Sequence, residues 1–395
     1  TITSLRSRHP DSFLTKEKVA DAFRRDHSYN VIILCKNHRK LKIDIPYFIE
    51  QFPNMEWTLW LDEADQNLGK SFVNQILLFQ NHSAVKRIVM ITSTPQSGPR
   101  GLFSTFKQDM TLLPLTEPCH SDYLSLKECS FQSFDSDTAE TTMDYVADYF
   151  QDFPKECPKP GQVWLIPAER RTNAHDLLVE GLFANNWFDV ILLINSKTKQ
   201  LFFQEQGVIR KVPISEIPGA LTTEMSRWLG TYYETQNISQ LRFAITGCEC
   251  INRGISIKSP QMPITHAIFS PRFCPMTKTS GANAYQGAAR ICGNSRSWNQ
   301  PLPKMISTDT FRKCVLFMER VAYDLATQAS SGKTVKISLQ SMLQLFKVHD
   351  DSKPLFTIDK ILKFKSWKEM LKNGKEKEVT DYVNTIAASQ KMRFG

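Results

Sequence analysis

Short runs of aliphatic and β-branched residues alternate along this chain with stretches in which apolar residues recur at every third or fourth position. Runs of about four to six such residues are typical of strands buried on both faces, and a period of about 3.6 residues is that of amphipathic helices. The alternation therefore predicts an α/β protein whose sheets are mainly parallel. In the first third of the chain we expect strands at 1–5, 30–35, 57–61, 87–92 and 110–115, and helices at 15–25, 45–52 and 72–80.

A proline-rich segment at 154–161 interrupts this alternation. The acidic, amphipathic stretch before it predicts a helix at 141–153, and we place a domain boundary at the prolines because Pro and Gly end regular structure. In the second series we expect strands at 162–167, 188–195, 200–203, 241–246, 265–270 and 304–307, and helices at 172–184, within 214–234 and at 311–328. The predicted units are 1–125, 126–160 (an acidic helix and a proline-rich linker), 161–310 and 311–395 (a helical, basic C-terminal extension).

Composition adds the class of protein and a hint of its partner. The length of 395 residues suggests two or three domains, at roughly 100–200 residues each. With 41% apolar and 23% charged residues, and no apolar run long enough to span a membrane, we expect a soluble, intracellular protein without a membrane partner. The nine cysteines include no Cys-x-x-Cys pair, which favours reduced thiols over a zinc site. A net charge of +9 weakly favours a polyanionic partner.

Two acidic residues, Asp62 and Glu63, directly follow the strand expected at 57–61. The end of such a strand lies at the carboxyl edge of a parallel sheet, where α/β proteins bind ligands. Phosphoryl transfer from ATP needs a carboxylate to hold Mg²⁺ and a second group to position the attacking water, and Asp62 and Glu63 suit these two roles. The alternative is an ordinary acidic start of a helix. These residues alone support either interpretation.

The sequence Asp62-Glu63-Ala64-Asp65 resembles the Walker B motif of superfamily 2 helicases, and 89–95 resembles their third motif. The resemblance implies that Asp62 holds Mg²⁺, that Glu63 is catalytic, and that Ser93 and Thr94 contact nucleic acid.

One segment before Asp62 and one far after it extend the resemblance. Residues 31–39 resemble the strand and loop between the family's first and second motifs, which implies that Asn37 and Arg39 touch the nucleic-acid backbone. Residues 241–257 resemble the fifth motif, in which Thr246 and Arg253 would contact nucleic acid and Gly254 the nucleotide. Backbone amides beside a glycine, with an arginine next to them, suit a phosphate.

The stretch 285–293 resembles the family's sixth motif, which carries an arginine finger across the cleft. Gln286 and Arg290 are spaced four apart, which would place both on one helix face, and Arg290 would stabilise the charge on the γ-phosphate. Gly293 stands where the family usually has a second arginine, and Arg296 is a candidate substitute that would bind the nucleotide. The glutamine form of this motif is closer to DNA helicases and to viral members than to DEAD-box RNA helicases.

The resemblance implies two tandem RecA-like lobes, at 1–125 and 161–310, with ATP and Mg²⁺ in the cleft between them and nucleic acid, DNA rather than RNA, across both. The sequence also resembles members from large DNA viruses or phages, and we expect the protein in the nucleus or cytoplasm of a host cell or in a viral replication compartment. The competing class is a catalytically inactive, helicase-like binding or structural subunit of a viral, replication or transcription assembly.

The glycine-rich loop that cradles the ATP phosphates in this family is not recognised in residues 1–395. Gly69-Lys70-Ser71 and Gly332-Lys333-Thr334 share its last letters but lack its first glycine, so we predict that both are turns. Residues 3–7 resemble the motif that follows this loop, so we expect the loop just upstream of Thr1.

Overall fold

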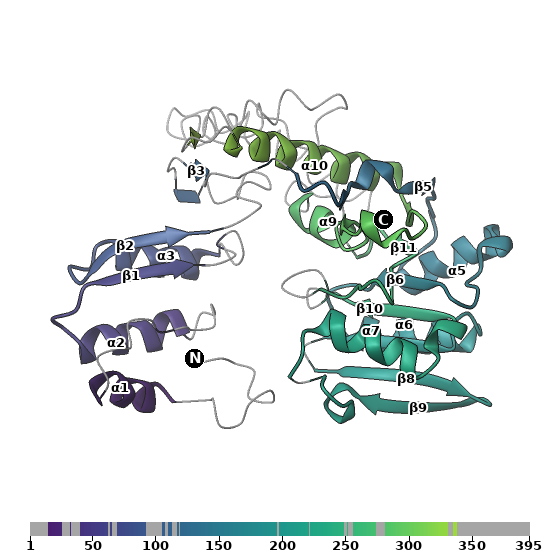
Figure 1. Cartoon of the computed structure of the whole chain (residues 1–395), viewed down its shortest axis with the longest axis horizontal. Helices are drawn as coiled ribbons and strands as arrows, with labels where there is room; N and C mark the ends of the chain where they lie inside the picture. The colour runs from purple at the N-terminus through teal and green to yellow at the C-terminus, as the bar shows by residue number, and fades with distance from the viewer. Residues whose placement is uncertain are drawn as a thin grey trace, which may run out of the picture.

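The computed structural model of this protein is an α/β structure built on an eight-stranded, mostly parallel sheet (Figure 1). It describes residues 15–25, 32, 40–61, 64, 69–91, 105–106, 110–112, 117, 119–195, 197–220, 222–248, 251, 256–273, 281–330 and 335–337. The strands expected at 1–5 and, except for residue 32, at 30–35 lie outside these residues. Within the described part of the chain, no helix has both the length and the apolar character needed to cross a membrane.

A two-stranded parallel sheet with its own hydrophobic core forms from the first part of the chain. Its elements are α1 (Lys16–Arg25), the π-helical turn η2 (Lys40–Asp44), α2 (Ile45–Gln51), β1 (Trp57–Leu61), α3 (Lys70–Gln80) and β2 (Val85–Met90). Along β1, Leu59 and Leu61 are buried in one cluster with Ile76 of α3, whereas Trp60 between them is 66% exposed. The alternation is that of a strand with one covered face. The strands expected at 57–61 and 87–92 and the three helices expected here are confirmed.

Gly69-Lys70-Ser71 does not form the turn that we predicted. Gly69 is the N-cap of α3, and the helix begins at Lys70. Phe72 and Ile76, which are four residues apart, are buried and hold this helix against the sheet. The other stretch predicted as a turn, 332–334, lies outside the described residues.

The eight-stranded sheet has the strand order β5-β13-β11-β6-β10-β7-β8-β9. Neighbours from β5 to β7 are parallel, and the hairpin β8–β9 adds two antiparallel strands at one edge. The strands are β5 (Ser130–Ser133), β6 (Val163–Pro167), β7 (Val190–Ile194), β8 (Lys199–Glu205), β9 (Val208–Pro213), β10 (Phe243–Gly247), β11 (His266–Phe269) and β13 (Lys304–Ser307). Every residue of β6, β7 and β10 is buried, as expected for central strands that are covered on both faces.

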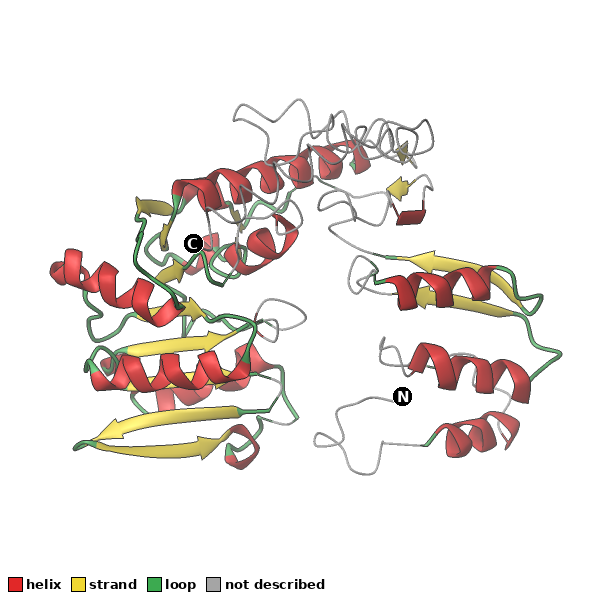
Figure 2. Cartoon of the chain, turned by 180° about the vertical axis from the view of Figure 1, so that it is seen from behind, coloured by secondary structure: helices red, strands yellow, loops and turns green. Residues whose placement is uncertain are grey.

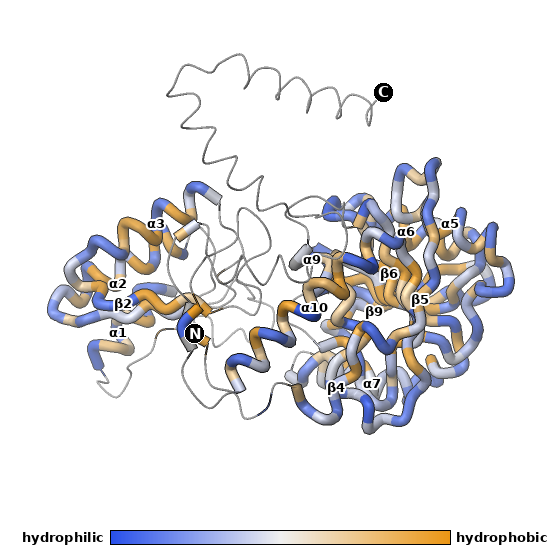
Figure 3. The backbone as a smooth tube through the Cα atoms, turned by 90° about the horizontal axis from the view of Figure 1, so that it is seen from above, coloured by the Kyte–Doolittle hydropathy of each residue, from blue (hydrophilic) through white to orange (hydrophobic). Residues whose placement is uncertain are grey.

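Helices cover both faces of this sheet (Figures 1 and 2). On one face α5 (Thr142–Asp152) and α6 (Thr172–Ala184) share a cluster with Trp164 and Ile166 of β6. On the other face α7 (Met225–Thr235), α9 (Gly281–Ala288) and α10 (Asp309–Ala329) share a cluster with Val163 and Leu165. Alternate residues of one strand therefore belong to two separate cores, and Figure 3 shows the apolar residues concentrated along these central strands.

Residues 126–160, which we expected to link two lobes, pack as part of this sheet. The helix expected at 141–153 is confirmed as α5, but β5 pairs with β13, and Tyr145 and Tyr149 of α5 are fully buried in the core. The prolines at 154–161 turn the chain from α5 into β6 through a short 3-10 helix, η4 (Pro154–Glu156). The aromatic residues of the acidic stretch before the prolines are therefore buried against the sheet.

Two small antiparallel sheets join segments that are far apart in sequence. β3 (Met110–Leu112) pairs with β14 (Val335–Ile337), and β4 (Tyr123–Leu124) pairs with β12 (Gly293–Asn294). The other short 3-10 helices are η3 (Leu126–Glu128), η5 (Ile214–Glu216), η6 (Ile238–Gln240) and η7 (Arg296–Trp298).

The helix expected at 311–328 is confirmed as α10. The start of the C-terminal extension therefore packs on the eight-stranded sheet through the buried residues of this helix.

We expect the fold to lose stability in mild acid because of His266. Its ring stacks on buried Trp164, with centroids 4.4 Å apart, and burial, followed by the charge of Lys304, lowers its pKa to about 4. An unfolded histidine has a pKa of about 6.5, so between these values the unfolded chain binds a proton that the folded chain does not. Chemical unfolding should show the wild type losing about 1–2 kcal/mol more than His266→Phe, which keeps a stacked ring, between pH 7 and pH 5. Equal losses would contradict this assignment.

Candidate functional site

The carboxyl ends of β1 and β2 lie side by side. Asp62 and Glu63, which the sequence predicted to hold Mg²⁺ and to act in catalysis, directly follow β1 in the sequence. The Ile91 amide donates to the carbonyl of Leu61 at 2.9 Å, and the Ala64 amide donates to the carbonyl of Ile91 at 2.9 Å. Ala64 is fully buried. The residues on each side of Asp62 and Glu63 are therefore tied to the end of β2. Asp62 and Glu63 themselves lie outside the described residues, as do Asn37, Arg39, Ser93 and Thr94.

The strands β6, β10 and β7 end side by side at the same edge of the large sheet. Gly247 stands beside Pro167 on one side and Ile194 on the other, and its carbonyl accepts a hydrogen bond from the Ala168 amide at 2.8 Å. A Cβ at position 247 would lie 2.2 Å from the carbonyl oxygen of Ile194, so this close approach of two strand ends requires glycine.

Thr246 is fully buried at this edge, and its hydroxyl oxygen meets no hydrogen-bond partner among the described residues. The sequence predicted it as a contact to nucleic acid, and the structure places it at the end of a central strand. The neighbouring candidates Arg253 and Gly254 lie outside the described residues, between the buried Ile251 and Ile257.

The segment after β6 closes the same edge and was not singled out from the sequence. The Glu169 carboxylate accepts the Thr142 amide at the start of α5 at 2.6 Å, and its carbonyl is 2.6 Å from Nε2 of buried His175. Arg170 and Arg171 follow and are exposed. Glu169 thus supports the positive end of the α5 dipole, while the two arginines give the carboxyl end of β6 an exposed positive charge.

Gln286 and Arg290 do not share a helix face, and this expectation is wrong. Gln286 is half-buried in α9, which ends at Ala288, and Arg290 follows in a turn whose amide donates to the carbonyl of Gly287 at 3.2 Å. Ile291, directly after this turn, is buried in the core that α9 and α10 share. Gly293 then has a φ of 109°, which a helix cannot accommodate.

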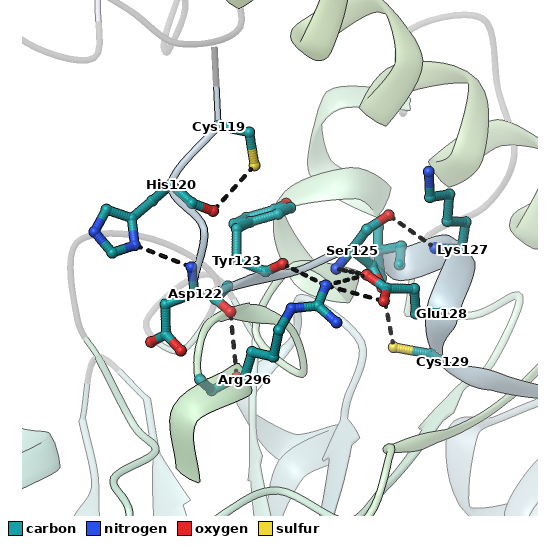
Figure 4. A network of polar contacts seen from close by, with 12 residues as sticks. Cys119, His120, Asp122, Tyr123, Ser125, Lys127, Glu128, Cys129 and Arg296 are labelled. Atoms are coloured by element: carbon teal, nitrogen blue, oxygen red, sulfur yellow. Dashed lines mark hydrogen bonds and ion pairs between the residues drawn. The ribbon is translucent and has the colours of Figure 1, made fainter. Parts of the chain in front are cut away.

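Arg296 is held by residues of its own unit (Figure 4). Its Nη2 donates to both carboxylate oxygens of Glu128 at 2.9 Å and to the carbonyl of Tyr123 at 2.9 Å. The backbone hydrogen bond from Ser125, followed by the hydrogen bonds and charge of Arg296, holds the pKa of Glu128 below its usual range. Arg296, which the sequence predicted as a nucleotide-binding residue, thus pairs with Glu128.

The segment around Glu128 is the part of the site that sequence reasoning missed. Glu319 of α10 accepts hydrogen bonds from the Ser125 hydroxyl at 2.7 Å, the Leu126 amide at 2.8 Å and the Tyr123 hydroxyl at 3.3 Å. Ser125 and Glu128 also form a capping box around η3. The pattern Ser-x-x-Glu is visible in the sequence and could have predicted this cap, whereas no local pattern predicts Glu319 as its partner.

Burial disfavours the charged forms of the titratable groups beside this segment. Burial raises the pKa of Cys292 to about 12 and that of Tyr285 to about 12, so both are protonated at neutral pH. Burial lowers the pKa of Lys258, whose Nζ donates to the Ser295 hydroxyl at 3.1 Å. A buried thiol of high pKa is a packing group and not a nucleophile.

No protein-family model matches this chain, and no curated protein matches it in sequence. What the protein does must therefore be inferred from its own residues and their positions.

Proposed function

We propose that this protein is an ATP-dependent superfamily 2 helicase or translocase, which binds ATP and Mg²⁺ between two RecA-like lobes and moves along nucleic acid, DNA in preference to RNA. In this proposal β1 and β2 belong to the first lobe and the eight-stranded sheet to the second. Asp62 holds Mg²⁺, Glu63 positions the attacking water, and Arg290 stabilises the charge on the γ-phosphate.

The observation that carries the proposal is where these residues stand in the sequence relative to β1, β10 and α9. Asp62 and Glu63 directly follow β1, Thr246 is the next-to-last residue of the central strand β10, and Arg290 follows α9. Ligands of open parallel sheets bind beyond the carboxyl ends of the strands. Two carboxylates after a strand of the first sheet and an arginine after a helix that packs on the second sheet are residue types that ATP hydrolysis requires.

The topology of the large sheet supports the proposal that a polyanion binds at the carboxyl ends of its strands. The chain leaves β6 for α6 on one face, and α9, the first described helix after the adjacent strand β11, lies on the opposite face. Such a divergence between neighbouring strands marks the point at which these sheets bind ligands. Arg170 and Arg171 are exposed beside it and suit the phosphates of a nucleic-acid backbone.

The Mg²⁺ assignment agrees with the chemistry of its donor. Mg²⁺ prefers oxygen ligands, is usually held by one or two carboxylates, and takes the rest from phosphates and water. Asp62 supplies such a carboxylate directly after a buried strand. The ion would neutralise the phosphate charge, while Arg290 and Glu63 act from the protein.

Replacing Glu63 by Gln tests the proposal. ATP hydrolysis by the full-length protein should rise on addition of single-stranded DNA, and Glu63→Gln should lower the stimulated rate by about a hundredfold because the attacking water loses its base. Phosphate release is the measurement, and Glu50→Gln, at an exposed position of α2, is the matched control.

The outcomes separate the two classes of function. If Glu63→Gln leaves the rate of ATP hydrolysis unchanged, the proposed mechanism is wrong. If neither DNA nor RNA stimulates hydrolysis, the protein is not a translocase. Nucleic-acid binding without any hydrolysis would assign the protein to the class of inactive, helicase-like binding subunits.

A further inference from the structure

Residues 119–128, which we call the strap, join the loop after Arg290 to α10 (Figure 4). The strap lies in sequence between β3 and β5, so it forms part of the only covalent path from the β1–β2 sheet to the eight-stranded sheet. Its contacts are made to the far end of the chain, with residues between 285 and 319.

The backbone of the strap pairs with the loop after Arg290. β4 and β12 form a short antiparallel pair, in which Tyr123 lies opposite Asn294. The carbonyl of Asp122 accepts the amides of Ser295 and Arg296, each at 3.0 Å, and its carboxylate accepts the amide of Ser297. This last bond is the main reason why the pKa of Asp122 lies below its usual value.

Side chains fasten the strap to three elements at once. Glu128 binds Arg296 of η7, and Glu319 of α10 receives three hydrogen bonds from the strap. The hydroxyl of Tyr123 also shares a hydrogen bond with that of Tyr285, which precedes Gln286 in α9. The strap therefore contacts the helix before Arg290 as well as the loop after it.

Arg290 is consequently fixed from both sides. Ile291 and Cys292, the two residues that follow it, are buried, and Gly293 begins the strand that pairs with the strap. Because so few residues separate Arg290 from these anchors, a displacement of the strap relative to the core must move the backbone that carries the arginine.

We propose that the strap positions Arg290, so that a shift of the chain between the two sheets is transmitted to the arginine finger. Arg296 and Glu128 are positioning residues in this device, and they do not touch the nucleotide. The inference rests on the proposed function for the role of Arg290 in catalysis, whereas the anchoring of the loop stands on the contacts alone.

The test compares Arg296→Glu with Arg296→Lys in the full-length protein. Arg296→Glu places a negative charge beside Glu128 and should raise amide hydrogen exchange in residues 286–292 and lower kcat for stimulated ATP hydrolysis by about tenfold, with little change in KM for ATP. Arg296→Lys should restore most of both, because all three contacts come from one nitrogen and an ammonium has three donors.

An exposed ion pair elsewhere supplies the control. Arg210 and Glu205 pair at 2.7 Å across the β8–β9 hairpin, and Arg210→Glu should leave both readouts at their wild-type values. Unaltered exchange in Arg296→Glu would overturn the strap as an anchor. Raised exchange with unaltered kcat would overturn its positioning role. A wild type without ATP hydrolysis would overturn the proposed function, while the exchange measurement would still decide whether the strap holds the loop.

Discussion

Replacing Arg290 by Ala is expected to slow stimulated ATP hydrolysis by about a thousandfold and to leave the affinity for ATP nearly unchanged. An arginine finger acts on charge that develops on the transferring phosphoryl group, so its removal affects the transition state more than the bound substrate. Arg290 lies shortly after the end of α9 and before β12, the strand that pairs with the strap. Steady-state phosphate release gives kcat, and a fluorescent ATP analogue gives the affinity.

Arg227→Ala is the matched control, because Arg227 is exposed on α7 of the same unit. It should hydrolyse ATP at the wild-type rate. A loss of less than about tenfold in Arg290→Ala would remove Arg290 from the transition state. An equal loss in kcat and in ATP affinity would make it a binding residue instead.

Gly247→Ala should destabilise the large sheet by about 3 kcal/mol or more. The added Cβ would lie 2.2 Å from the carbonyl oxygen of Ile194, which is backbone in a fully buried strand and has no room to move. Thermal unfolding should show a fall in Tm of about 6–12 °C for a unit of this size. Because the two strand ends would be forced apart, we expect the loss whatever the protein binds.

Gly207→Ala separates this clash from the general cost of replacing a glycine. Gly207 has a φ of 82° at the tip of the β8–β9 hairpin, and a Cβ there would meet nothing within 4 Å. Its replacement should cost only about 1 kcal/mol, which is the strain of a left-handed backbone. Similar losses in the two variants would show that the approach of β10 to β7 is not a close one in solution.

The central part of the fold could be predicted from the sequence because its buried strands and helices have clear patterns of apolar residues. β1, α6 and β13 begin and end where their apolar patterns do. β9 was missed because its first four residues are exposed and include Arg210 and Lys211. It is a strand through its pairing with β8, and that pairing leaves no periodic signal in β9 itself.

Parts of the candidate site depend on distant contacts and escaped prediction for that reason. The spacing of Gln286 and Arg290 favours one helix face, but α9 ends at Ala288 and the chain turns before Arg290. Arg296 was a candidate substitute for the family's second arginine although its spacing differs, and its partner Glu128 lies 168 residues away in the sequence. Local spacing predicts such roles only where the tertiary core permits the helix to continue.

The tip of the β8–β9 hairpin is a suitable site for inserting a label. Gln206 and Gly207 form a tight turn with positive φ values of 51° and 82°. Exposed hairpin tips of this kind are where proteins best accept a change in chain length. A short tag or a fluorophore could therefore be inserted between these two residues, and it would leave the strand ends that carry the proposed chemistry free of any label.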